Sequence, residues 1–144
     1  MQQRDFSSLG LPAGILSTLD AIGFVTPTPI QAAAIPALLE GRDLLGAAET
    51  GTGKTAAVAR PILQRLEAGP RKRIRALVVA PTRELAEQIH QSFGDLGRQT
   101  RLRSTAIYGG VGFGAQLQAL RSGVEIVVAC PGRLLDHVRQ GNVD

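Results

Sequence analysis

Apolar residues along the chain follow two patterns, which predict where helices and strands lie. Where they recur every three or four residues they form one face of a helix, and where they follow one another in a short run they indicate a strand. The helical pattern covers residues 9–23, 27–41, 53–69, 82–97, 114–123 and 132–141, with Pro61 expected to bend the third helix. Short apolar runs cover residues 42–48, 74–80, 102–108 and 124–130, so predicted strands alternate with predicted helices.

Strands that alternate with helices predict an α/β fold, with a mainly parallel sheet and helices on both of its faces. Ligands of such sheets bind where loops leave the carboxyl ends of the strands. Three loops meet this condition, at residues 46–55, 80–84 and 129–133, because each follows a predicted strand and precedes a predicted helix. These loops are therefore the first candidates for a functional site.

The first of these loops contains the run Ala-Glu-Thr-Gly-Thr-Gly-Lys-Thr at residues 48–55, which fits a phosphate-binding loop. Gly51 and Gly53 allow the backbone to turn successive N–H groups toward one anion, and the helix that follows adds its positive end. In this interpretation Lys54 neutralises the β- and γ-phosphates, and the hydroxyl of Thr55 holds Mg²⁺. The run therefore predicts a site for a nucleoside triphosphate and Mg²⁺, with Lys54 and Thr55 as its catalytic side chains.

A dinucleotide-binding loop is an alternative interpretation of the same residues. The required glycine and alanine spacing occurs at residues 51–56, but it occurs again at residues 110–115, so the pattern discriminates little. A dinucleotide site also needs an acidic residue after the next strand to bind a ribose, and Ala80 and Pro81 stand there. The Gly-Lys-Thr ending has no role in that scheme, which favours the phosphate loop over a dinucleotide-dependent oxidoreductase.

The composition is that of one globular domain with a basic surface. The chain has 144 residues, of which 44% are hydrophobic, and a formal net charge of +4. Fourteen arginines stand against two lysines, which fits a polyanionic partner and fits an arginine-rich proteome equally well. No run is long and apolar enough to span a bilayer, and the N-terminus has no signal-peptide core, so we expect a soluble cytoplasmic protein without a membrane partner.

The cysteine and histidine side chains give no signal for a metal or a nucleophile. Cys130 ends a predicted strand, and we expect it to pack rather than react. His90 and His137 lie in predicted helices without metal-ligand spacing, and we expect both to lie at the surface or at its boundary.

Upstream of the phosphate loop, the run Gly-Phe-Val-Thr-Pro-Thr-Pro-Ile-Gln at residues 23–31 resembles the Q motif of DEAD-box ATP-dependent RNA helicases. Phe6 stands where that family has an isolated upstream aromatic residue. A glutamine amide both donates and accepts hydrogen bonds, so it matches N6 and N7 of adenine. The resemblance implies that Gln31 selects adenine and that the chain binds ATP, ADP or AMP with Mg²⁺. The nucleotide-binding residues it implies are Phe6, Phe24, Thr26, Gln31, Thr50, Gly51, Thr52, Gly53, Lys54 and Thr55, with Thr55 as the Mg²⁺ ligand.

Downstream, three further runs are similar to motifs of the same family. Residues 81–85 resemble motif Ia, residues 109–110 the GG motif, and residues 130–136 motif Ib, in which Cys130 replaces the usual threonine. In the family these loops bind the backbone of single-stranded RNA, which agrees with the chemistry of arginine forks, a hydroxyl group and exposed glycine N–H groups. The RNA-binding residues that the resemblance implies are Pro81, Thr82, Arg83, Gly109, Gly110, Pro131, Gly132 and Arg133.

The resemblance covers nearly the whole chain and implies a RecA-like fold of the P-loop NTPase class, a three-layer sandwich. The family's Asp-Glu-Ala-Asp and Ser-Ala-Thr motifs do not occur in the sequence. We therefore expect residues 1–144 to be an incomplete N-terminal RecA-like helicase domain. Its partner in the whole protein would be a second RecA-like domain, and the whole protein would unwind short RNA duplexes with ATP hydrolysis.

By itself the chain is expected to hydrolyse ATP negligibly, because the motif that supplies the carboxylates for Mg²⁺ and water does not occur in it. A second hypothesis is a nucleic-acid-binding module that keeps this fold while its ATP site is idle.

Overall fold

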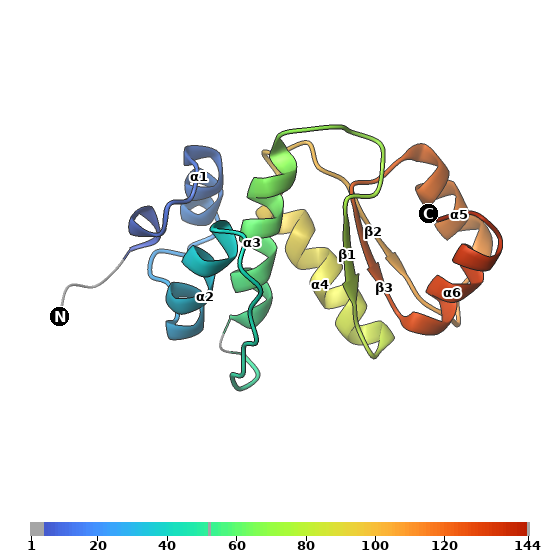
Figure 1. Cartoon of the computed structure of the whole chain (residues 1–144), viewed down its shortest axis with the longest axis horizontal. Helices are drawn as coiled ribbons and strands as arrows, with labels where there is room; N and C mark the ends of the chain where they lie inside the picture. Colours follow the sequence, from blue (N-terminus) through green and yellow to red (C-terminus); the bar gives the residue numbers. More distant parts are fainter. Residues whose placement is uncertain (1–4, 52, 144) are drawn as a thin grey trace. The chain divides into compact units, whose positions relative to one another are not determined.

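The computed structural model describes residues 5–51 and 53–143, and Figure 1 shows its helices and strands. A 3-10 helix, η1, spans Phe6–Leu9. The α-helices of the described residues are α1 Ala13–Ala21, α2 Pro29–Leu39, α3 Lys54–Glu67, α4 Arg83–Leu96, α5 Phe113–Ser122 and α6 Pro131–Arg139. The strands are β1 Ala76–Val79, β2 Ser104–Ile107 and β3 Ile126–Ala129.

The chain forms two compact units, and the first contains η1, α1, α2 and α3. It consists of the described residues up to Ala68 together with Asp95–Arg101. Pro29 starts α2, where a missing N–H costs no helical hydrogen bond, and α2 packs against α3. The apolar core of this unit comes from all four helices and includes Phe6, Leu9, Ile15, Leu19, Ile35 and Leu63.

The predicted helix at residues 9–23 is shorter in the structure. Gly10 has a φ of 79°, a left-handed conformation that ends η1. Pro12 then stands at the cap of α1, so the helix begins only at Ala13. The apolar stripe predicted for residues 15–22 is correct for Ile15 and Leu19, which are buried.

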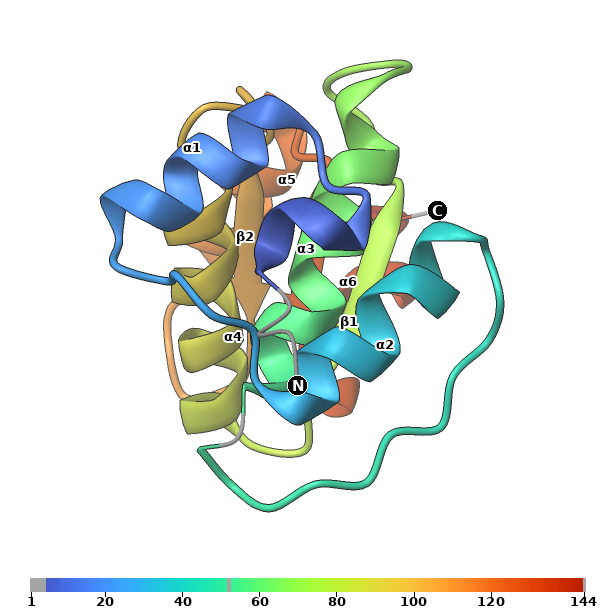
Figure 2. The same cartoon turned by 90° about the vertical axis from the view of Figure 1, so that its left-hand side faces the viewer.

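The second unit contains a parallel sheet with the strand order β1-β3-β2. Ala76 of β1 and Ser104 of β2 both pair with Ile126 of the central strand β3. Within this unit, Figures 1 and 2 show α4 on one face of the sheet and α5 and α6 on the other. Every side chain of β3 is buried. Val127 and Ala129 of β3 form a core cluster with Ile107 and Val124, against which Ile74, Leu120 and Leu134 pack. The predicted α/β fold with a parallel sheet is confirmed.

The buried carboxylate of Glu125, just before β3, holds the chain segments that enter the two outer strands. It accepts the backbone N–H of Lys72 at 2.6 Å and that of Arg103 at 2.8 Å. Carboxylates that accept backbone N–H groups make strong, charge-assisted hydrogen bonds. These two hydrogen bonds tie the segments that precede β1 and β2 to the start of the central strand β3.

The predicted strand at residues 42–48 is wrong for this structure. The segment forms no strand, and Leu44 and Leu45 are exposed, Leu45 completely. A short apolar run has the composition of a strand, but a strand also needs a neighbour that completes its hydrogen bonds. The three strands of the described residues pair only with one another, so this run has no such neighbour. The phosphate loop therefore follows an extended segment, whereas the loops at 80–84 and 129–133 do follow strands.

No helix in the described part of the chain combines the length and apolar character that crossing a membrane requires.

Candidate nucleotide and RNA sites

In the first unit, the glycine loop at residues 48–55 leads directly into α3. Gly51 and Gly53 have φ values of 81° and 87°, and Gly53 is the N-cap of the helix. A Cβ built on Gly53 would lie 2.3 Å from Nε2 of Gln31, so a side chain there would force the Gln31 amide to move, in addition to the strain of the left-handed φ. Around Gly51 a Cβ would meet open space, so at that position it is the left-handed conformation that favours glycine. Thr52 lies outside the described residues.

The start of α3 has the features that bind a phosphate group. Among the described residues no side chain caps the helix, and the first backbone N–H groups of α3 have no partner within the helix itself. Lys54 is exposed at the first position, and its ammonium group donates to the carbonyl oxygen of Ala48 across the loop. Thr50 is exposed, and Thr55 lies half-buried in the first turn. Lys54 and Thr55 therefore offer an ammonium group and a hydroxyl group at the start of α3, which is the chemistry that a phosphate with Mg²⁺ requires.

Gln31 lies against this loop although it comes 22 residues earlier than Gly53. Its amide is completely buried, and its Nε2 donates to the carbonyl oxygen of Gly53 at 3.3 Å. Its Oε1 accepts the backbone N–H of Thr28 at 3.1 Å, which closes the first turn of α2. Gln31, which the resemblance implies for the base, thus contacts Gly53 of the loop that it implies for the phosphates.

Phe6 and Phe24, the aromatic residues of the Q-motif region, both contact a buried arginine. Cζ of Arg60 lies 4.1 Å from the ring centroid of Phe6 and 5.3 Å from that of Phe24. Arg60 is completely buried, and this burial lowers the pKa of its guanidinium to about 10. Phe6 and Phe24 also line an open hollow of about 230 Å³ with Leu16, Leu19 and Val25 among its apolar walls. Thr26 is exposed beside this cluster.

In the second unit, the three loops predicted to bind RNA follow the carboxyl ends of β1, β2 and β3. The side chains of Pro81, Thr82 and Arg83 are exposed after β1. Oγ1 of Thr82 accepts the backbone N–H of Leu85 at 3.3 Å and so caps α4. Cζ of Arg83 lies 5.3 Å from the ring centroid of Tyr108, the last residue before the two exposed glycines Gly109 and Gly110.

Tyr108 is held in place from α4 as well. Its hydroxyl donates to Glu87 at 3.0 Å, and this hydrogen bond, with burial as a smaller cause, raises the pKa of Tyr108. Gly110 has a φ of 82°, which a residue with a side chain rarely adopts. Loops 80–83 and 108–112 therefore lie together through Arg83 and Tyr108.

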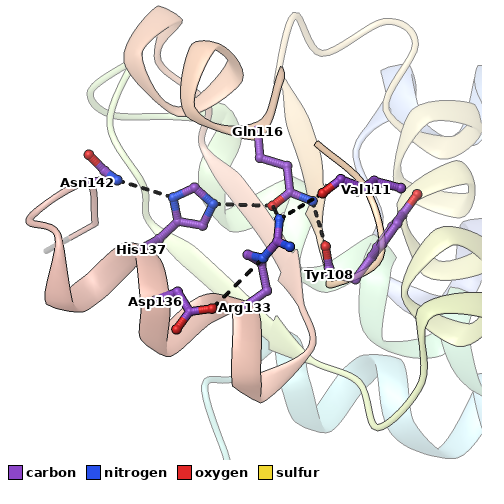
Figure 3. A network of polar contacts seen from close by, with 7 residues as sticks. All are labelled: Tyr108, Val111, Gln116, Arg133, Asp136, His137 and Asn142. Carbon is purple, nitrogen blue, oxygen red and sulfur yellow. Dashed lines mark hydrogen bonds and ion pairs between the residues drawn. The ribbon is translucent and has the colours of Figure 1, made fainter. Parts of the chain in front are cut away.

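Arg133 joins the third loop to the second through the polar network in Figure 3. Its Nη1 donates to the carbonyl oxygen of Val111 at 3.1 Å and to Oε1 of Gln116 at 3.3 Å. Nε2 of Gln116 in turn donates to the carbonyl oxygen of Tyr108 at 2.8 Å. Pro131 and Gly132 are exposed at the start of α6, just before Arg133. The structure thus brings the predicted RNA-binding residues of all three loops to one end of the sheet.

His137 is not at the surface, as the sequence analysis expected, but completely buried. Its ring stacks on Phe113 with the centroids 4.1 Å apart, and its Nε2 lies 3.2 Å from Oε1 of Gln116. Burial, helped by the positive charge of Arg133 and opposed by Asp136, lowers the pKa of His137. His137 is the seventh residue of α6 and lies one helical turn after Arg133, on the buried face of the helix. The sequence analysis did not assign it to that face.

Comparison with known proteins identifies the family. The model of the DEAD/DEAH box helicases matches residues 28–144 of the chain. The chain belongs to this family.

Other members of the DEAD/DEAH box family align with nearly all of the chain. It is 50% identical to the ATP-dependent RNA helicase DeaD of Escherichia coli over 99% of this chain and 23% of that protein. It is 44% identical to the DEAD-box ATP-dependent RNA helicase RhpA of Helicobacter pylori, over 96% of this chain and 28% of that protein. The chain therefore spans about a quarter of the length of these curated relatives.

Solved structures of the family share the fold. A DEAD box protein from Methanococcus jannaschii matches 97% of this chain and 38% of its own, with a TM-score of 0.88 and 37% identity. A hypothetical ATP-dependent RNA helicase from Sulfolobus tokodaii matches 93% of this chain and 38% of its own, with a TM-score of 0.84 and 39% identity. The expected membership of the family and its α/β fold are thus confirmed.

Two buried polar residues of this family member were missed by sequence reasoning, Arg60 and Gln116. Arg60 follows Ala57 by three residues and precedes Leu63 by three, so its place on the buried face of α3 was a readable signal. Gln116 lies on a short helix with a mixed pattern, and its sequence gives no comparable signal. Its hydrogen-bond partners, the carbonyl group of Tyr108 and the side chains of Arg133 and His137, come close to it only in the folded chain.

Proposed function

We propose that the chain binds ATP, ADP or AMP through Gln31 and the loop at residues 48–55, and that it contacts the backbone of single-stranded RNA through the loops that follow β1, β2 and β3. The whole protein would then be an ATP-dependent RNA helicase that unwinds short duplexes, with a second RecA-like domain supplying the remaining motifs. The printed names of the relatives, ATP-dependent RNA helicases, support this proposal.

One observation carries the nucleotide part of the proposal. The Gln31 amide contacts the carbonyl group of Gly53, the N-cap of α3, where no side chain of the described residues caps the helix. A group that recognises bases by hydrogen bonds and a group that binds anions by helix N–H groups are thereby adjacent. That combination suits a nucleotide better than a free anion or a free base.

Each residue has a separate task in this proposal. The N–H groups at the start of α3 and the ammonium of Lys54 bind the phosphates, for which Lys54 must exchange the carbonyl of Ala48 for a phosphate oxygen. A bound Mg²⁺, held in part by the hydroxyl of Thr55, would neutralise phosphate charge. Arg83 and Arg133 present guanidinium groups, and Gly109, Gly110 and Gly132 present exposed backbone, to the RNA phosphates.

The test uses the two lysines of the chain as a matched pair. Lys54→Gln removes the ammonium group from the start of α3, whereas Lys72→Gln removes one from an exposed loop of the second unit. Hydrogen bonds to charged groups contribute about 1.5–3 kcal/mol, so we expect Lys54→Gln to weaken ADP binding roughly tenfold to a hundredfold, measured by calorimetry. Lys72→Gln should bind ADP as the unaltered chain does.

Equal ADP binding by both variants would refute the nucleotide site and leave the nucleic-acid-binding module with an idle ATP site. Binding of NADPH in place of ADP would favour the dinucleotide interpretation. The negligible ATP hydrolysis expected of the chain alone stays a prediction, and the same samples measure it.

A further inference from the structure

Exposed arginines lie at the amino end of the sheet, opposite the loops proposed to bind RNA. Because the sheet is parallel, the segments that enter the three strands meet at this end: residues 69–75 before β1, 102–103 before β2 and 121–125 before β3. Figure 1 shows them at the upper end of the sheet. Each segment contributes an exposed arginine, and we call these side chains the amino-end surface: Arg73, Arg103 and Arg121.

Two hydrogen-bonded contacts and one close backbone approach hold the three segments together. The carboxylate of Glu125 accepts the backbone N–H groups of Lys72 and Arg103. Lys72 has a left-handed φ of 61°, and a Cβ built on Gly123 would lie 2.7 Å from its Cα. Nη2 of Arg103 donates to Oγ of Ser122 at 3.0 Å. Each arginine of the amino-end surface takes part in one of these contacts or is next in sequence to a residue that does, so the three share one face of the unit.

No exposed carboxylate balances the positive charge of the amino-end surface. The three segments contain one acidic residue, Glu125, which is buried and bonded to backbone N–H groups. None of the three arginines forms an ion pair with another described residue. In the sequence, the second unit has nine basic and five acidic residues and the first unit has seven of each, so the net charge of +4 belongs to the second unit. A surface of this kind attracts polyanions.

The side chains that would favour a protein partner or stacked bases do not occur in these segments. None of the exposed large apolar residues in the described part of the chain lies there, and the segments contain no aromatic residue. The core of a protein–protein interface is depleted in charged residues, and single-stranded bases stack on aromatic rings. A phosphate backbone requires neither, because guanidinium groups bind phosphate oxygens through charge-assisted hydrogen bonds.

We propose that the amino-end surface is a second RNA-binding surface, which binds the phosphate backbone without regard to base sequence. This inference rests on the proposed function for its ligand, RNA, but not for its residues, because Arg83 and Arg133 follow the carboxyl ends of the strands. Strands of four residues, at about 3.3 Å per residue, separate the two ends of the sheet by about 13 Å. The two surfaces therefore hold different parts of one RNA.

The test measures how the binding of a single-stranded RNA of about 30 nucleotides depends on salt. One phosphate contact contributes about 0.7 to the slope of log affinity against log salt concentration. The variant Arg73→Gln/Arg103→Gln/Arg121→Gln removes three contacts, so it should lower this slope by about 2. At about 0.1 M salt the same three contacts correspond to a roughly hundredfold weaker affinity.

A matched control separates these contacts from a change in net charge. Arg42→Gln/Arg65→Gln/Arg139→Gln removes three exposed arginines that lie outside the three segments. It changes the net charge by the same amount as the test variant, and it should leave the slope unchanged.

A second test variant serves if the first does not fold. Arg73→Gln/Arg121→Gln keeps the hydrogen bond from Arg103 to Ser122 and should lower the slope by about 1.4, the value for two contacts.

An unchanged slope in the test variants, or an equal decrease in the control, overturns the inference and leaves the proposed RNA loops in place. Arg83→Gln tests those loops in the same assay. A decrease in the test variants with no decrease in Arg83→Gln overturns the loop assignment and supports the amino-end surface. Absence of RNA binding in the unaltered chain overturns both.

Discussion

The hydrogen bonds of Gln116 are expected to contribute a measurable part of the stability of the second unit. Gln116 is 6% exposed and bonds to the carbonyl of Tyr108, to Arg133 and to His137. Gln116→Ala breaks all three contacts, and the partners keep their positions in the buried network without a replacement. The substitution therefore removes the link between α5, α6 and the loop after β2 (Figure 3).

The size of the effect follows from the partners. Each of the two neutral hydrogen bonds contributes about 1 kcal/mol, and the bond from the Arg133 guanidinium contributes about 1.5–3 kcal/mol. We take the lower end for Arg133, because it keeps the carbonyl of Val111 at 3.1 Å. The free energy of unfolding should fall by about 3.5 kcal/mol, which corresponds to a melting temperature lower by roughly 10 °C for a chain of this size.

Urea titration followed by tyrosine fluorescence measures this change directly. Tyr108 is the single tyrosine and the chain has no tryptophan, so the signal comes from the second unit alone. Gln116→Leu fills the space without the hydrogen bonds and should lose nearly as much stability as Gln116→Ala. Gln118→Ala, on the exposed side of the same helix, should change the free energy of unfolding by no more than about 0.5 kcal/mol. If Gln116→Ala is as mild as Gln118→Ala, the network does not stabilise the unit and this reasoning is refuted.

Two further predictions concern the same unit. Arg83→Gln should weaken the binding of single-stranded RNA and lower the slope of log affinity against log salt concentration by about 0.7, the value for one phosphate contact. Arg139→Gln, on the exposed side of α6, should change neither the affinity nor the slope. Equal slopes for the two variants would exclude a phosphate contact at Arg83. The pKa of His137 in the folded chain lies below its usual value of 6.5. As the pH falls below 6.5, the unfolded chain therefore takes up a proton before the folded chain does. The free energy of unfolding should then decrease as the pH falls from 6.5 toward the folded pKa. In denaturation curves between pH 7.5 and about 5, His137→Gln should remove this slope and His90→Gln should keep it, and an unchanged slope in His137→Gln would contradict the assignment.

The sequence predicted much of the fold because most of its signals are local. Alternating strand and helix patterns gave the α/β class and a parallel sheet, and β3 is the clearest example, because all four of its residues are buried. The helix starts at Pro29 and Lys54 follow from proline and glycine conformations that need no distant partner. The run at residues 42–48 was misread because a strand is a property of two chain segments, and its partner is not encoded in its own composition.

The candidate site was predictable where a motif has a fixed local geometry. Glycines at 51 and 53 adopt the left-handed conformations that their place in a phosphate loop suggests, and Arg83 and Arg133 lie in loops after strands, as the alternation required. Gln116 and His137 were missed or misplaced, because their hydrogen-bond partners lie 17 and 21 positions away in the sequence. For Arg60 the helix face was readable, but its partner Gln31, 29 positions away, was not.

By itself, the amino-acid order determined the class of fold, the helix that follows the glycine loop, and the kinds of side chain in the candidate sites. Only the tertiary structure decided that Arg60 contacts the amide oxygen of Gln31. It also decided that Gln116 of α5 contacts both Arg133 and His137 of α6. The reason is the range of the forces involved: backbone conformation and helix periodicity act between near neighbours, whereas burial removes water from groups that are distant in sequence and makes them satisfy one another.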